Sequence, residues 1–207
     1  MLHPNASSNW LLIEFVQQPG IHMNLTLKYR VLILLGLAAA VASTRMSHFG
    51  NAALLPDASL AAFLVGGILL RRLGGFSVLM AVAFCTDVIS ARSAVEAGWC
   101  LTPAYWGLIP TYAVLWLTGR WLGKDHRLES IAGASVSLAA IACAFLVSNA
   151  FWFLLSNTVT ALTPLQYILA VAKYFPPYLG SAALYLVPLW VGWKLTRASL
   201  SHQPEKT

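Results

Sequence analysis

Residues 130–155 read SIAGASVSLAAIACAFLVSNAFWFLL, a run without any Asp, Glu, Lys or Arg. A helix that crosses a bilayer needs about 20 mostly apolar residues, and this run is long enough. The rest of the chain has the same character, since 58% of all residues are hydrophobic and only 10% are charged. Ordinary soluble domains carry about 25% charged residues, which they need to cover a water-facing surface. The sequence therefore predicts an all-α, polytopic membrane protein.

Six apolar segments predict a bundle of six transmembrane helices. They run from about Leu25 to Ser43, Ser59 to Leu70, Phe76 to Ser90, Pro103 to Leu122, Ser130 to Leu155 and Pro177 to Leu195. The second and third are short and flanked by glycines, which leaves their ends open by several residues. Between the last two segments, only Leu165–Ala172 is apolar and it is too short to span. We expect a structured loop or a re-entrant piece there, and no seventh helix.

The distribution of Lys and Arg predicts that both termini are cytoplasmic, because cytoplasmic loops of membrane proteins are enriched in these residues. With that orientation the inner side carries ten of them: Lys28, Arg30, Arg71, Arg72, Arg120, Lys124, Arg127, Lys194, Arg197 and Lys206. The outer side carries three: Arg45, Arg92 and Lys173. The net charge of +6 is thus explained by topology, and we expect no nucleic-acid partner. Three outer loops, at residues 44–58, 91–102 and 156–176, are the expected ligand-binding regions.

The two ends of the chain are predicted to lie outside the bundle, which occupies residues 23–198. Residues 1–22 form a leader whose apolar part is too short to span and lacks the basic start of a signal peptide. Met23 follows directly, so this leader is either an upstream start or an addition from cloning. Residues 199–207 form a polar C-terminal tail.

The first segment carries small residues at a spacing of four, among them Ala38 and Ala42. Such a stripe lets another helix approach closely, which drives helix association in lipid. Two interpretations stay open with similar weight. The stripe packs within the bundle, or it is a docking face for a partner membrane protein.

Asp87 lies near the outer end of the third segment. A carboxylate at membrane depth is costly, and such a group faces a polar cavity or a charged partner. We favour a cavity-facing role for Asp87. The alternatives are a structural pair with Arg92 or a hydrogen bond to a neighbouring helix.

Cys100 differs from Cys85 and Cys143 because it lies in a predicted outer loop, within Gly98–Trp106, and not inside an apolar segment. A thiolate is a soft ligand that suits polarisable transition metals. One cysteine cannot complete a closed zinc or iron–sulfur site, which needs about four ligands. It can, however, occupy one open axial position of a metal already held in a macrocycle. The alternative is a loop cysteine with no special role.

Asp87, Cys100 and Tyr105, separated by thirteen and five residues, resemble a motif of the solitary cobalamin-specific S-components of energy-coupling factor (ECF) transporters, the BtuM family. The six short helices and the alanine stripe are similar to S-components in general. The resemblance covers roughly residues 23–197.

The resemblance implies a bacterial cytoplasmic-membrane protein that binds cobalamin (vitamin B12) at its outer face and mediates its uptake. It implies that the Cys100 thiolate ligates cobalt, that Asp87 and Tyr105 line the corrin site, and that cyanide can be displaced from cyanocobalamin. Ala38 and Ala42 would then dock onto an ECF coupling subunit with its ATPases. Whether the protein works alone or with that module stays open. The alternatives are an S-component for another vitamin and a membrane thiol enzyme that processes corrinoids.

Overall fold

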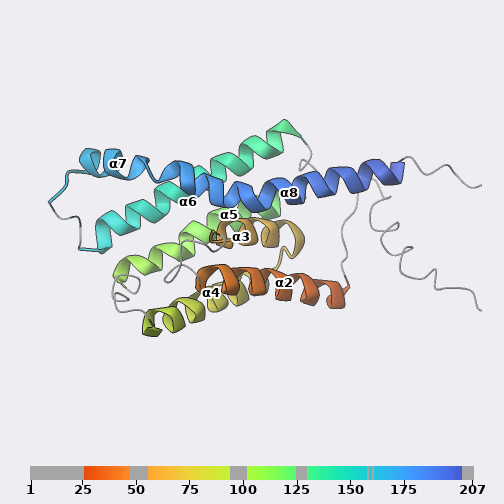
Figure 1. The fold of residues 1–207 in the computed structure, drawn as a ribbon, viewed down its shortest axis with the longest axis horizontal. Coiled ribbons are helices and arrows are strands. Elements are labelled where there is room, and N and C mark those ends of the chain that lie inside the picture. Colours follow the sequence, from red (N-terminus) through yellow and green to blue (C-terminus); the bar gives the residue numbers. More distant parts are fainter. Residues whose placement is uncertain are drawn as a thin grey trace, which may run out of the picture.

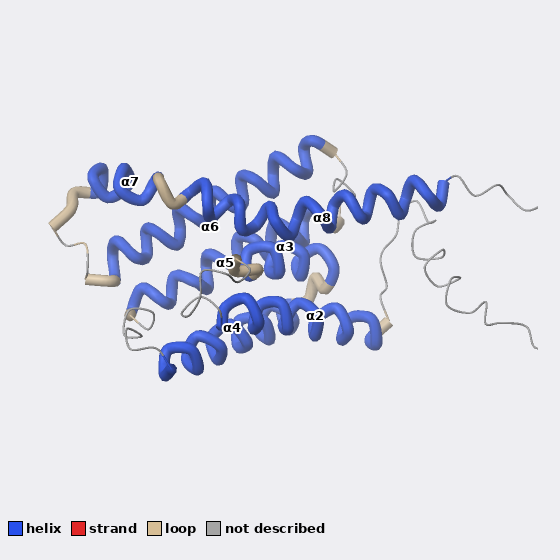
Figure 2. The backbone as a smooth tube through the Cα atoms, viewed as in Figure 1, coloured by secondary structure: helices blue, strands red, loops and turns tan. Residues whose placement is uncertain are grey.

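The computed structural model describes residues 26–46, 56–93, 102–124, 130–157, 159 and 161–201. Within these ranges the chain forms helices and no strand (Figure 2). They are α2 (Leu27–Met46), α3 (Ser59–Leu69), α4 (Leu73–Ser93), the 3-10 helix η3 (Pro103–Gly107), α5 (Leu108–Leu122), α6 (Ile131–Leu155), α7 (Pro164–Ala172) and α8 (Phe175–Ser201). The predicted leader, residues 1–22, lies outside the described part of the chain.

Three helices are long and apolar enough to cross a membrane: α2 over Leu27–Arg45, α4 over Leu73–Arg92, and α6 over Ile131–Leu155. Their outward faces carry large apolar side chains such as Leu35, Ile89 and Leu154. In water, exposed apolar area costs about 25 cal/mol per Å². Helices of this kind are compatible with a membrane protein whose outer surface contacts lipid. The prediction of six membrane-spanning helices goes beyond these three helices, and it stays a prediction.

The helices lie roughly along one long axis in three layers (Figure 1). The central layer contains α3 and α5, which pack closely on each other; α6 and α8 lie on one side, and α2 and α4 on the other. The beginning of α2 and the end of α8 lie at the same end of the bundle (Figure 1). The opposite end is where α2, α4 and α6 finish and η3 begins.

Apart from helix ends that are shifted by up to three residues, as in α2 and α4, the structure differs from the predicted segments in three places. The predicted fourth helix is split into η3 and α5, and Pro110 falls in the first turn of α5, where a missing backbone N–H breaks no helical hydrogen bond. The predicted structured loop or re-entrant piece before the last segment contains a nine-residue helix, α7. The helix α7 is still too short to span. Finally, α8 continues to Ser201, into the predicted tail.

The α3–α5 contact depends on glycines, because the two backbones touch. A Cβ atom added at Gly67 would lie 2.2 Å from the carbonyl oxygen of Trp116, and one added at Gly119 would lie 2.1 Å from that of Leu64. Neither neighbour is a flexible side chain that could move aside. The same contact places the Phe63 ring flat on the Tyr112 ring, with centroids 4.2 Å apart. This packing fixes the beginning of α5, which carries Tyr112, relative to the beginning of α3.

We expect Gly67→Ala and Gly119→Ala each to destabilise the protein by about 1–3 kcal/mol or more, because overpacking forces backbone shifts. The measurement is thermal unfolding of the purified protein in detergent. The control is Gly36→Ala in α2, where an added Cβ meets nothing within 4 Å. Alanine there should be neutral or stabilising by up to about 1 kcal/mol, since it favours helix more than glycine does. Equal behaviour of all three variants would contradict backbone contact between α3 and α5.

Candidate functional site

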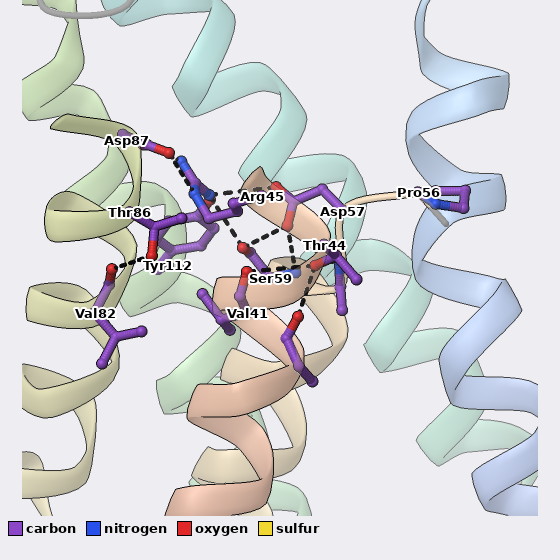
Figure 3. A network of polar contacts seen from close by, with 12 residues as sticks. Val41, Thr44, Arg45, Pro56, Asp57, Ser59, Val82, Thr86, Asp87 and Tyr112 are labelled. Atoms are coloured by element: carbon purple, nitrogen blue, oxygen red, sulfur yellow. Dashed lines mark hydrogen bonds and ion pairs between the residues drawn. The ribbon is translucent and has the colours of Figure 1, made fainter. Parts of the chain in front are cut away.

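A buried arginine joins four elements at the end of the bundle where α2 finishes (Figure 3). Arg45 lies in the last turn of α2, and its residue is only 8% exposed. Its guanidinium reaches Asp87 on α4, Asp57 and Ser59 at the start of α3, and Tyr112 on α5. We call Arg45, Asp57, Ser59, Asp87, Tyr105 and Tyr112 the polar cluster.

Asp87 receives three hydrogen bonds in this cluster. Arg45 binds it with two nitrogens: Nε donates to Oδ1 over 2.8 Å, and Nη2 donates to Oδ2 in a very close contact. The hydroxyl of Tyr105 donates to the same Oδ2 over 2.8 Å. A bidentate arginine–carboxylate pair combines strong, charge-assisted bonds with a fixed relative orientation. The side chain of Asp87 is thereby held rigidly between α2 and η3.

The other side of the guanidinium ties α2 to the central layer. Nη1 of Arg45 donates to Oδ2 of Asp57 over 3.2 Å, to the Ser59 hydroxyl over 3.0 Å and to the Tyr112 hydroxyl over 2.7 Å. Oδ1 of Asp57 accepts from both the backbone N–H and the hydroxyl of Ser59, over 2.8 and 2.6 Å. Thr44 adds a further link, since its hydroxyl accepts from the backbone N–H of Ala58 over 3.0 Å. The start of α3 is thus fixed against the end of α2.

The balance of charges explains why the cluster can exist inside a largely apolar bundle. Taking an unpaired charge out of water costs several kcal/mol, and the cost is offset only when a partner and further hydrogen bonds are present. Arg45 has two carboxylates, Asp57 and Asp87, whose side chains are 28% and 8% exposed. Asp57 can therefore share its charge with solvent, whereas Asp87 depends on Arg45. Asp87 and Arg45 form the buried ion pair of the cluster.

The structure brings two of the three predicted site residues together. Asp87 and Tyr105 are joined by the hydrogen bond described above, and the Tyr105 ring also meets Phe84 edge-on, with centroids 5.9 Å apart. Cys100 lies outside the described residues. Among the residues that are described, no group of three or more His, Cys, Asp or Glu side chains is arranged to hold a metal ion.

The partner of Asp87 is a residue that the sequence interpretation did not propose. Of the alternatives considered there, a contact with a neighbouring helix is the one observed, through Arg45, and the described part of the chain shows no ion pair between Asp87 and Arg92. Arg45 was considered only as one of three outer basic residues. Its position at the end of an apolar segment is the signal that could have identified it, because a cation at that depth needs a carboxylate.

The predicted docking residues lie on a partly covered face of α2. Ala38 packs against the main core, and Ala42 is half-buried. Val41 between them is fully buried against Ala62 and Ala83. Packing inside the bundle therefore uses at least Ala38, and docking of a partner through Ala38 and Ala42 stays a prediction.

A second feature at the same end of the bundle is an apolar cavity of about 580 Å³ between α6, α7 and the start of α8. Its polar groups satisfy each other: the Tyr167 hydroxyl donates to Oδ1 of Asn149 over 3.2 Å, and Nδ2 of Asn149 donates to the Phe145 carbonyl over 2.8 Å. Burial raises the pKa of Tyr167, so its hydroxyl stays protonated at neutral pH and remains a donor. This contact, together with the Phe153–Tyr167 ring pair, attaches α7 to α6.

Comparison with known proteins adds no family assignment: no protein-family model matches the chain, and no curated protein sequence matches it either.

Proposed function

We propose that this protein binds cobalamin at the outer end of the bundle and mediates its uptake across a bacterial cytoplasmic membrane. In this proposal six helices span the membrane, both termini are cytoplasmic, and the polar cluster lies near the outer surface. The Cys100 thiolate ligates cobalt, and Asp87 and Tyr105 belong to the corrin site.

The observation that carries this proposal is the hydrogen bond between Tyr105 and Asp87. These two residues lie on either side of Cys100 in the sequence, thirteen residues before it and five after it. Because Asp87 on α4 and Tyr105 on η3 are hydrogen-bonded to each other, the two residues that the resemblance assigns to the corrin site lie together, as the proposal requires.

The proposed chemistry is a ligand exchange on cobalt. The thiol of Cys100 loses its proton to solvent, and the thiolate donates an electron pair to form a Co–S bond. In cyanocobalamin the Co–CN bond breaks, and cyanide leaves with its electron pair. The oxidation state of cobalt does not change, so no reductant is needed. A soft thiolate is well suited to this exchange.

Uptake has two arrangements under this proposal. The protein moves cobalamin alone, or it docks onto an ECF coupling subunit with its ATPases through the face that includes Ala38 and Ala42. The lipid bilayer and cobalamin are its partners in either case, and nucleic acid is not one.

Growth of a cobalamin-requiring bacterial strain without other uptake systems tests the transport step. We expect the wild-type protein to restore growth at low cobalamin and Cys100→Ala to fail at equal membrane abundance, because the proposed cobalt bond is lost. If Cys100→Ala transports as well as the wild type, the cysteine is dispensable and cobalt ligation through Cys100 is wrong.

The same strain separates a transporter from an enzyme. A wild-type protein that removes cyanide from cyanocobalamin in detergent, yet does not restore growth, would be a corrinoid-processing thiol enzyme. A protein that does neither would be consistent with an S-component for a different vitamin, and cobalamin would be excluded as its ligand.

A further inference from the structure

The hydrogen bonds around Asp87 limit what this carboxylate can offer a ligand. An ionised carboxylate is an acceptor only, with about four lone-pair sites. Three donors already occupy it, two from Arg45 and one from Tyr105, and its side chain is 8% exposed. Direct ligand contact with Asp87 is therefore restricted. Asp87 acts most directly on Tyr105, which is half-buried and therefore more exposed than Asp87.

Asp87 determines which way the Tyr105 hydroxyl points its proton. A phenol can donate one hydrogen bond and accept others, and its hydrogen turns to suit the surroundings. Because an ionised Asp87 can only accept, the proton of Tyr105 lies toward Oδ2, 2.8 Å away. The oxygen of Tyr105 then has lone pairs left over. Toward anything that approaches from outside, Tyr105 is a hydrogen-bond acceptor.

Arg45 keeps this arrangement in place. It holds both oxygens of Asp87 with two nitrogens of one rigid plane, and its third nitrogen is fixed by Asp57, Ser59 and Tyr112. Without the guanidinium, Asp87 would lose two of its three donors, and its Oδ2 would no longer be fixed opposite the Tyr105 hydroxyl. The phenol oxygen would then no longer be held in one orientation for a ligand.

We propose that Arg45 is a positioning residue of the ligand site, which fixes Asp87 so that Tyr105 presents an acceptor to an N–H or O–H group of the ligand. The inference rests on the proposed function: cobalamin carries such donors in its peripheral carboxamides and in water bound to cobalt. Arg45 itself does not touch the ligand. Its effect on binding passes through Asp87 to Tyr105.

A double-mutant cycle tests this path. The proteins are wild type, Arg45→Lys, Tyr105→Phe and the double variant in detergent, and the measurement is the Kd for cyanocobalamin by calorimetry. Both variants lose the same hydrogen bond to the ligand, and we expect each single variant to weaken binding by about tenfold. The double variant should bind no more than about twofold more weakly than the weaker single variant, because both changes remove the same interaction.

A control variant loses a hydrogen bond outside the polar cluster. Tyr167→Phe deletes the hydroxyl that donates to Oδ1 of Asn149. We expect it to lower the midpoint of thermal unfolding, as Arg45→Lys does, and to leave the Kd within about twofold of the wild type. A purely structural role of Arg45 would instead give both variants the same small effect on binding.

A second cycle covers the case in which Arg45→Lys does not fold. Asp87→Asn keeps the shape of the side chain, but its amide can donate to Tyr105 and consume the acceptor. We expect Asp87→Asn and Tyr105→Phe to be non-additive in the same way. Additive losses in the cycle, or wild-type affinity in Arg45→Lys, would overturn the positioning role while the proposed function stands. Absence of cobalamin binding in the wild type would overturn the proposed function, and this inference with it.

Discussion

Replacing Arg45 with Met is expected to destabilise the protein by about 3–5 kcal/mol, the typical cost of removing one partner of a buried ion pair. Methionine fills a similar volume but leaves Asp87 with Tyr105 as its only donor among the contacts described. The cost comes mainly from this stranded carboxylate, because Asp57 can turn to solvent. The measurement is thermal unfolding in detergent, relative to wild type.

The double variant Arg45→Met/Asp87→Asn separates the stranded charge from lost packing. The amide introduced in place of the Asp87 carboxylate would be neutral, and it can still form a hydrogen bond with Tyr105. We therefore expect this variant to regain most of the lost stability, although neither partner of the ion pair remains. If it is as unstable as Arg45→Met alone, the buried charge of Asp87 is not the source of the effect.

Replacing Cys100 with Ala is expected to abolish cyanide release from cyanocobalamin, since the proposed Co–S bond cannot form. Released cyanide is measured directly after mixing the purified variant with excess ligand. Cys85→Ala and Cys143→Ala are the matched controls: both thiols are free and exposed on helices that can span the membrane, and they are expected to behave as wild type. Cyanide release by Cys100→Ala would show that another group attacks cobalt.

The helical content was predictable because apolar length and charge distribution act locally along the chain. The predicted segment Ser130–Leu155, for example, matches α6 almost to the residue, and the structure shows that Ser130 caps this helix by accepting from the backbone N–H of Gly133. The split between η3 and α5 was not predicted, because it depends on where Pro110 falls within a turn. The helix α7 was not predicted, because the apolar run Leu165–Ala172 was assessed only for its ability to span a membrane, for which it is too short. Its Thr163–Gln166 capping box was the local signal.

The candidate site was only partly predictable for a different reason. Asp87 and Tyr105 were identified from the sequence, but their partner Arg45 is 42 residues from Asp87 and belongs to another helix. The hydrophobic pattern of a sequence indicates which charged or polar residues lie within apolar segments. It does not show which of these residues contact each other in the fold. The meeting point is set by the α3–α5 packing through Gly67 and Gly119, which places Tyr112 beside the end of α2.

The visible absorption spectrum of cyanocobalamin, titrated with purified wild-type protein, tests the central claim most directly. Replacement of cyanide by a thiolate changes the ligand field of cobalt. We predict a change in the spectrum that saturates at one protein per cobalamin, and that is absent with Cys100→Ala. A spectrum that stays unchanged while the intact protein is in excess would contradict cobalt ligation by Cys100, and with it the proposed site.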